Sequence, residues 1–100
     1  MTGQLSGALA DCTAQLRAAF VAPIIDEHRL IDAACAYVDA ARTLGWRVER
    51  VIIEVKRIAV VEDGPIFRAM RDPMRREEAH ALVDRVITRC INHYYSDVRA

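Results

Sequence analysis

The stretch RVERVIIEVKRIAVV, residues 47–61, decides the fold class of this chain. β-Branched residues fill it, and their propensity favours a β-strand. Its apolar positions nevertheless recur at steps of three and four residues, as on one face of an α-helix, and the apolar run at 51–53 breaks the alternation of a half-buried strand. Periodicity should outrank propensity here, so we expect a helix. The apolar positions are Val48, Val51, Ile52, Val55, Ile58 and Ala59.

The rest of the chain also carries helical patterns, separated by short breaks. In the first segment, for example, Leu5, Leu9, Cys12 and Leu16 fall on one face. Short connections favour antiparallel neighbours. The sequence therefore predicts a single all-α domain over residues 1–100. It is a bundle of four main helices, at about 3–20, 26–44, 47–61 and 73–95, with a short helical turn near 65–70.

Residues at the helix ends support these boundaries. Asp26 is a typical N-cap for the second helix, although a start at Pro23 fits as well. Gly45 follows that helix, where a glycine commonly closes a helix C-terminus. Asp72 and Pro73 together resemble an N-cap followed by the first helical residue of the last helix.

Composition narrows the class of protein. Fourteen basic and fourteen acidic residues cancel, so no overall field attracts nucleic acid or an anionic membrane. No segment has the roughly 20 apolar residues of a membrane span, and the N-terminal segment does not resemble a signal peptide. Three separated cysteines suit reduced thiols in a cytoplasm. We therefore expect a small, bacterial-type cytoplasmic protein without a bound cofactor, whose 53% hydrophobic content favours self-association.

Cys90 and His93 lie one helical turn apart, a spacing that two metal ligands could use. Further ligands would have to come from Cys12, Cys35, His28 or His80. The three cysteines, however, occupy the centres of apolar stripes, where cysteine behaves as a small hydrophobic residue. We therefore predict buried thiols and a solvent-exposed His93, and no metal site.

A cluster of arginines lies between the third and last helices. Arg68, Arg71, Arg75 and Arg76 fall within nine residues, interleaved with Ile66, Phe67 and Met70. Guanidinium groups near a helix start can bind a phosphate or carboxylate, or Glu77, Glu78, Glu62 and Asp63 can neutralise them on the surface. Arginine mixed with large apolar side chains is also typical of protein interfaces. The predicted docking surface comprises Phe67, Arg68, Met70, Arg71 and Arg75, with Trp46 as a second exposed anchor and Tyr95 as an intersubunit contact.

The segment AARTLGWRVERVIIEVK, residues 40–56, resembles the core of a helix-turn-helix. Ala41, Gly45 and Val51 have the family spacing of a small residue, a turn glycine and an apolar residue. The resemblance implies DNA contacts from Arg47, Arg50, Lys56 and Arg57. Glu54, however, falls where the family usually has a buried aliphatic residue, and the chain is not basic overall.

The segment KRIAVVEDGPIFRAMRDPMRREE, residues 56–78, is similar to the middle of the helical chorismate mutases. That resemblance implies contacts to substrate carboxylates from Lys56 and Arg29. The long first helix of that family is interrupted here at Gly45. No other enzyme signature is present in the sequence, which favours binding over catalysis.

These patterns predict a protein-interaction or regulatory adaptor module that binds another protein or itself, as a homodimer. A helix-turn-helix DNA-binding regulator that uses the helix at 47–61 is the alternative, and a chorismate-mutase-like enzyme is a lesser one. No membrane partner is expected, and nucleic acid is the less favoured ligand.

Overall fold

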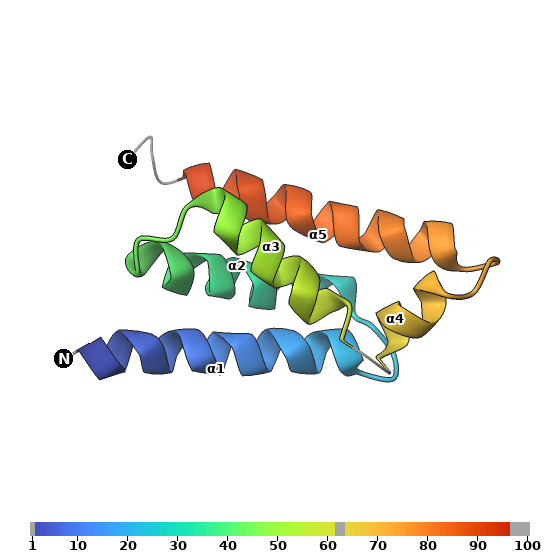
Figure 1. The fold of residues 1–100 in the computed structure, drawn as a ribbon, viewed down its shortest axis with the longest axis horizontal. Coiled ribbons are helices and arrows are strands. Elements are labelled where there is room, and N and C mark those ends of the chain that lie inside the picture. The colour runs from blue at the N-terminus through green and yellow to red at the C-terminus, as the bar shows by residue number, and fades with distance from the viewer. Residues whose placement is uncertain (1, 62–63, 97–100) are drawn as a thin grey trace.

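The computed structural model describes the backbone of residues 2–61 and 64–96 and the side chains from residue 7 onward within them, and this part contains helices and no strand (Figure 1). The all-α prediction is confirmed. The helices are α1 (Thr2–Val21), α2 (Glu27–Thr43), α3 (Val48–Ala59), α4 (Pro65–Met70) and α5 (Arg76–Ser96). The side chain of Leu5 and the residues Glu62 and Asp63, which the sequence patterns invoked, lie outside the described residues.

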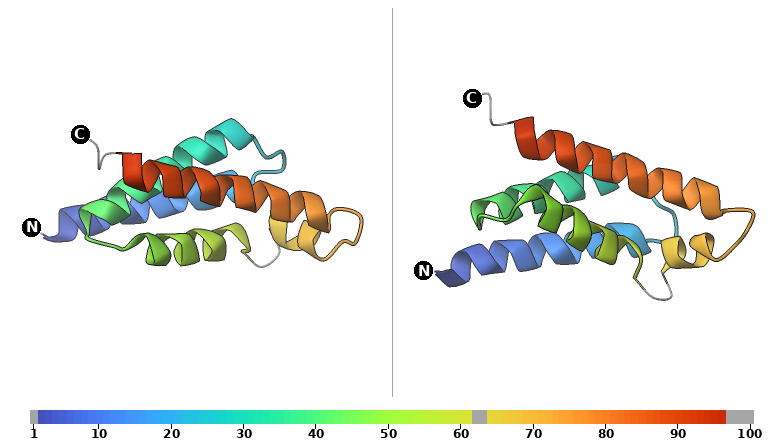
Figure 2. Two further views of the ribbon diagram at one scale, coloured as in Figure 1. Left: turned by 90° about the horizontal axis from the view of Figure 1, so that it is seen from above. Right: turned by 45° about the horizontal axis from the view of Figure 1, so that its top comes forward.

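The four long helices form an elongated bundle with principal extents of 45 × 28 × 21 Å. α1 and α2 pack against each other in antiparallel orientation, and α5 packs on both α2 and α3 (Figures 1 and 2). α1 and α5 lie on opposite sides of the bundle. The short helix α4 contacts α1 and α5 where α1 and α3 finish and α5 begins. α4 therefore closes one end of the bundle.

The core explains why residues 47–61 form a helix. Val51, Val55, Ile58 and Ala59 of α3 are buried, at the spacing that places them on one helical face. Burial of this whole apolar face against α1 and α5 stabilises the helix by more free energy than the modest β-propensity of these residues costs it. The largest fully buried side chains are Phe20, Leu16, Leu30, Val38, Val51, Val55, Val86 and Cys90.

The ends of α2 have the predicted caps. The Asp26 carboxylate accepts hydrogen bonds from the backbone N–H groups of His28 and Arg29, at 3.1 and 3.3 Å, so the helix starts after Asp26 and not at Pro23. At the other end Gly45 adopts φ +83°, a conformation that glycine enters without strain.

Two backbone hydrogen bonds complete the C-terminal cap of α2. The N–H of Gly45 donates to the carbonyl of Arg42, and the N–H of Trp46 donates to the carbonyl of Ala41. This pair of bonds defines a Schellman motif. It turns the chain sharply into the connection to α3.

The predicted start of the last helix is wrong by three residues, because α5 begins at Arg76 rather than at Pro73. The Asp72 carboxylate accepts from the N–H of Met74 at 2.9 Å, and its carbonyl accepts from the N–H groups of Arg75 and Arg76. Asp72 therefore stabilises a turn that precedes the helix. Every other predicted helix boundary lies within two residues of the observed one.

No helix in the described part of the chain is both long and apolar enough to cross a membrane.

Candidate functional site

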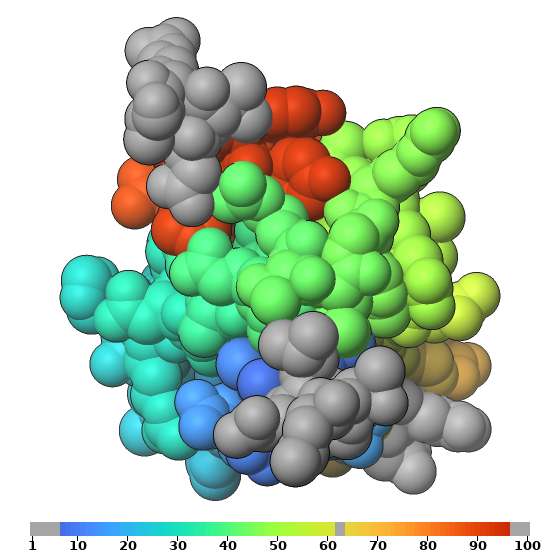
Figure 3. Space-filling model, turned by 90° about the vertical axis from the view of Figure 1, so that its left-hand side faces the viewer, coloured from blue at the N-terminus to red at the C-terminus, as the bar shows by residue number. Residues whose placement is uncertain are grey.

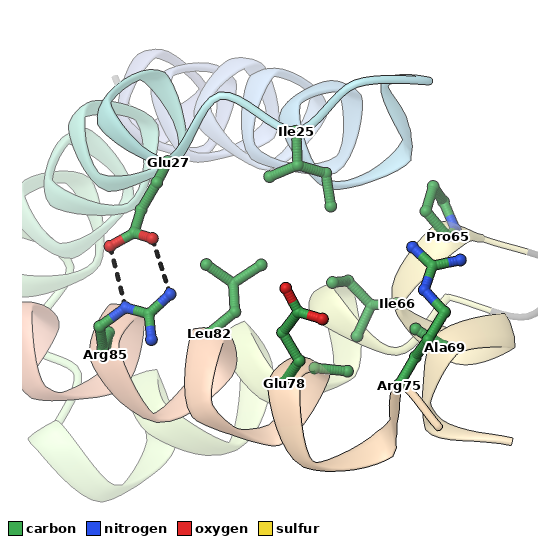
Figure 4. A pocket seen from close by; sticks show the side chains of 10 residues that line it. Ile25, Glu27, Pro65, Ile66, Ala69, Arg75, Glu78, Leu82 and Arg85 are labelled. Carbon is green, nitrogen blue, oxygen red and sulfur yellow. Dashed lines mark hydrogen bonds and ion pairs between the residues drawn. The ribbon is translucent and has the colours of Figure 1, made fainter. Parts of the chain in front are cut away.

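A pocket of about 270 Å³ opens between the start of α2, α4 and the first half of α5; we call it the α4 pocket (Figure 4). The side chains of Ile25, Ile66 and Leu82 point into it from three different parts of the chain. Its apolar wall consists of Ile25, Pro65, Ile66, Ala69, Ala79 and Leu82, and its charged lining consists of Glu27, Arg75, Glu78 and Arg85. The pocket thus combines an aliphatic floor with two acids and two bases.

Glu27 and Arg85 neutralise each other on one side of the pocket. The Nε and Nη2 atoms of Arg85 donate to the two carboxylate oxygens of Glu27, at 3.0 and 2.8 Å (Figure 4). These hydrogen bonds lower the pKa of Glu27 and raise the pKa of Arg85. The ion pair joins the first turn of α2 to the middle of α5, so neither group is available to a ligand without breaking it.

Arg75 and Glu78 are the remaining charged groups of the pocket. Figure 4 shows both side chains directed toward its interior. Within the described residues, neither guanidinium nor carboxylate has an ion-pair or hydrogen-bond partner, although the two residues stand one helical turn apart. The α4 pocket therefore presents an exposed Arg75 without an ion-pair partner in the described residues, and an exposed Glu78 that interacts electrostatically with Arg85, beside an apolar floor.

Two large apolar side chains stand out from the surface next to the pocket. Met74 is 90% exposed and precedes Arg75, and Ile24 is 87% exposed and precedes Ile25. Val21 and Val60, also exposed, belong to the same end of the bundle. We call this region, comprising residues 21–25, 60–61 and 64–78, the α4 end.

The predicted docking residues of α4 and of the turn that follows it lie at this end, but of these only Arg75 lines the pocket. Arg68 and Arg71 are exposed, whereas Phe67 and Met70 are partly buried. The Arg71 guanidinium lies 5.5 Å from the centre of the Phe67 ring. The arginines therefore flank the pocket without converging on one point.

Trp46 and Tyr95, the other two predicted docking residues, lie at the opposite end of the bundle, which Figure 3 shows face on. The prediction of Trp46 as an exposed anchor is wrong, because its side chain is partly buried against the core. The Arg50 guanidinium stacks 3.8 Å from the centre of its ring, and Tyr37 meets it edge-on. The hydroxyl of Tyr94 donates to the Trp46 carbonyl at 2.8 Å.

Tyr95 is half exposed and packs edge-on against Tyr94, with 5.1 Å between ring centres. Its predicted role as an intersubunit contact stays a prediction. We call the group of Tyr37, Trp46, Arg50, Tyr94 and Tyr95 the Trp46 end. Most of its aromatic and polar side chains contact one another. The residue types that are common in interface hot spots therefore make their contacts within the chain here.

The cysteines and histidines do not form a metal site in the described part of the chain, where no cluster of three potential ligands occurs. Cys90 is buried, and burial raises the pKa of its thiol to about 12. The side chain of His93 is 34% exposed, in keeping with the prediction that it meets solvent, and its Nε2 lies 2.9 Å from Oδ1 of Asp39. His93 thus links α5 to α2 and faces away from Cys90.

The helix-turn-helix resemblance finds mixed support. Ala41 and Val51 are buried around the Gly45 turn, as the spacing predicts. Two of the proposed DNA-contacting arginines are engaged elsewhere, however. Arg50 stacks on Trp46, and Arg57 forms a 3.1 Å ion pair with Glu54.

The structure does not bring together the two residues that the chorismate-mutase resemblance assigns to one substrate site. Lys56 and Arg29 are both exposed, on α3 and α2, which lie on opposite sides of the bundle (Figure 2). Two side chains so placed do not converge on one substrate.

No protein-family model matches the chain, and no curated protein and no solved structure is significantly similar to it. Functional inference therefore starts from the α4 pocket. Sequence reasoning missed Ile25, Glu78 and Leu82 as site residues. Their only sequence signal is the step of four residues from Glu78 to Leu82 on one helical edge, which does not by itself reveal a pocket.

Proposed function

We propose that this chain is a small cytoplasmic protein-interaction module, of the regulatory adaptor kind, that self-associates through its α4 end. One observation carries the proposal: among the described residues, the two most exposed large apolar side chains, Ile24 and Met74, directly precede residues that line a pocket with an exposed arginine and an exposed glutamate. Exposed apolar groups that gather on one surface usually mark a contact with another molecule. Methionine and arginine are both enriched in protein interfaces.

The small size of the domain supports self-association. A domain of 100 residues buries a smaller share of its surface than a larger one, and a second copy removes further apolar surface from water. The α4 end leaves the most exposed such surface, because the connections there leave Ile24 and Met74 more exposed than any other large apolar side chain of the described residues. The Trp46 end, in contrast, covers most of its aromatic side chains with its own arginines and tyrosines.

Light scattering over a wide range of protein concentration tests the proposal. We expect the mass to rise from 11.3 kDa toward twice that value, and the double variant Ile24→Asp, Met74→Asp to remain at 11.3 kDa. Ile53→Asp is the matched control, because Ile53 is 52% exposed on the outer face of α3, away from the pocket. A mass of 11.3 kDa for the wild type at every concentration would contradict self-association.

DNA binding through α3 is a second candidate, supported by the buried Ala41 and Val51 around the turn at Gly45. If α3 reads DNA, a gel shift with mixed duplex DNA at low salt shows retardation that disappears steeply as salt rises. Lys56→Gln should then weaken binding, because Lys56 is exposed on α3. Absence of retardation at micromolar protein excludes this candidate.

A further inference from the structure

We propose that two copies associate about a two-fold axis that passes beside the start of α5, so that Met74 of each copy enters the α4 pocket of the other. The inference rests on the proposed self-association and specifies its geometry. A two-fold interface is self-complementary, because one surface must supply both the inserting group and the receiving pocket. The turn before α5 and the pocket beside it meet that requirement, since Met74 and Arg75 are sequence neighbours.

Charge defines the register of the two helices. If the α5 helices run antiparallel with the axis between Arg76 and Glu77, Arg75 of each copy comes level with Glu78 of the other. Both side chains point into the pocket, and within the described residues of one chain Glu78 interacts electrostatically with Arg85 without a hydrogen bond to it, while Arg75 forms no ion pair. The pairing supplies each with an opposite charge in a partly desolvated position, where ion pairs set partner choice and register.

The same register places the apolar groups together. The same axis brings the turn that carries Met74, directly before α5, next to the first turn of the second copy's α5, where Ala79 forms part of the pocket wall. The floor then offered to Met74 consists of Ile25, Ile66 and Leu82.

The size of the pocket suits such a group. Its volume of about 270 Å³ is roughly nine times the share of one water molecule in the liquid, enough for a methionine side chain. Methionine is unbranched and adapts to irregular apolar pockets. Met74 would lose most of the exposure that it has in one copy, where 90% of it is in contact with solvent.

Charge reversal tests this geometry directly. Arg75→Glu opposes two acids, and Glu78→Arg opposes two bases, at each of the two contacts between residues 75 and 78, so each variant alone should raise the dissociation constant of the dimer about tenfold or more. An equimolar mixture of the two variants should associate again, because each pair across the axis then joins an acid of one copy to a base of the other. The double variant Arg75→Glu, Glu78→Arg should likewise recover the wild-type dissociation constant.

Matched controls separate this effect from a general change in charge. Arg29→Glu and Glu49→Arg alter exposed residues on α2 and α3 that do not line the pocket, and we expect both to leave the dissociation constant close to that of the wild type. Circular dichroism establishes that each variant is folded before its mass is measured by analytical ultracentrifugation.

Three outcomes overturn the proposal. If the single charge variants dimerise like the wild type, a different surface mediates self-association, and the proposed function survives without this geometry. If they are monomeric and the mixture remains monomeric, the Arg75–Glu78 pairing is wrong. If the wild type itself is monomeric at every concentration, the geometry and the proposed self-association fall together.

Discussion

The two ends of this bundle use similar residues in opposite ways. At the Trp46 end, Arg50 stacks on the indole, Tyr37 meets the ring edge-on and the Tyr94 hydroxyl donates to a backbone carbonyl. At the α4 end, Arg75 and Glu78 are exposed and form no hydrogen bond or ion pair with each other, and Met74 is almost fully exposed. The first arrangement stabilises the monomer, whereas the second leaves binding capacity at the surface.

This difference shows that composition alone does not identify a docking surface. Tryptophan, tyrosine and arginine are over-represented among interface hot spots, and the sequence therefore favoured Trp46 as an anchor. The same side chains also bury well against one another inside a small domain. Such side chains stabilise the fold when their contacts lie within one chain, and they can bind a partner when those contacts are missing. Substitutions at the two ends should therefore have different effects on stability.

The largest expected effect is that of Trp46→Ala. Removing a large aromatic side chain that packs on the core and on Arg50 should lower the free energy of unfolding by about 3 kcal/mol. Met74→Ala, at the other end, should change it by less than about 0.5 kcal/mol when measured on the monomer. Urea denaturation at low protein concentration measures both. Equal losses for the two variants would contradict the contrast between the ends.

Tyr94→Phe should have the next largest effect. The variant keeps the ring and removes the hydroxyl that donates to the Trp46 carbonyl at 2.8 Å, in a partly buried position. Leaving that carbonyl unsatisfied should cost about 1.5 kcal/mol of stability. Tyr95→Phe is the control, because Tyr95 is half exposed, and its stability should stay near that of the wild type.

Asp26→Ala should destabilise the protein by about 1 kcal/mol, since its carboxylate caps the first turn of α2. Asp26→Asn retains an acceptor for the backbone N–H groups of His28 and Arg29 and should recover most of the loss. Thermal unfolding of the two variants measures the difference. If Asn and Ala prove equally destabilising, the side chain does not act as a cap.

The smallest expected effect is on the loss of stability at acidic pH. The ion pair with Arg85 lowers the pKa of Glu27, so its stabilising contribution is complete above the ordinary value of 4.5 and is lost as the pH falls through the lowered pKa of the folded protein. Glu27→Gln should therefore remove a small part of the loss of stability below about pH 4.5. Denaturation curves between about pH 3 and 7, with Glu77→Gln as the control, test the sign. A steeper acid loss in Glu27→Gln would contradict it.

Local signals predicted most of the fold. The three- and four-residue steps of residues 47–61 identified a helix against their β-propensity, and Asp26 and Gly45 marked the two ends of α2 correctly. The helix start predicted from Asp72 was wrong, because the carboxylate of Asp72 accepts a hydrogen bond from the N–H of Met74 and stabilises a turn before the helix. An aspartate before a proline looks alike in both situations, since the two differ only in the backbone that follows.

What the sequence by itself determined is the set of amphipathic helices and the caps that begin and end them, because these depend on contacts within a few residues. Only the tertiary structure decided which charges remain available. Glu27 and Arg85 are far apart in the chain yet pair across α2 and α5, whereas Arg75 and Glu78 are close in the chain and do not pair. The packing of α5 against α2 brings Glu27 and Arg85 together, and the packing of α4 beside the start of α5 leaves Arg75 and Glu78 at an open pocket.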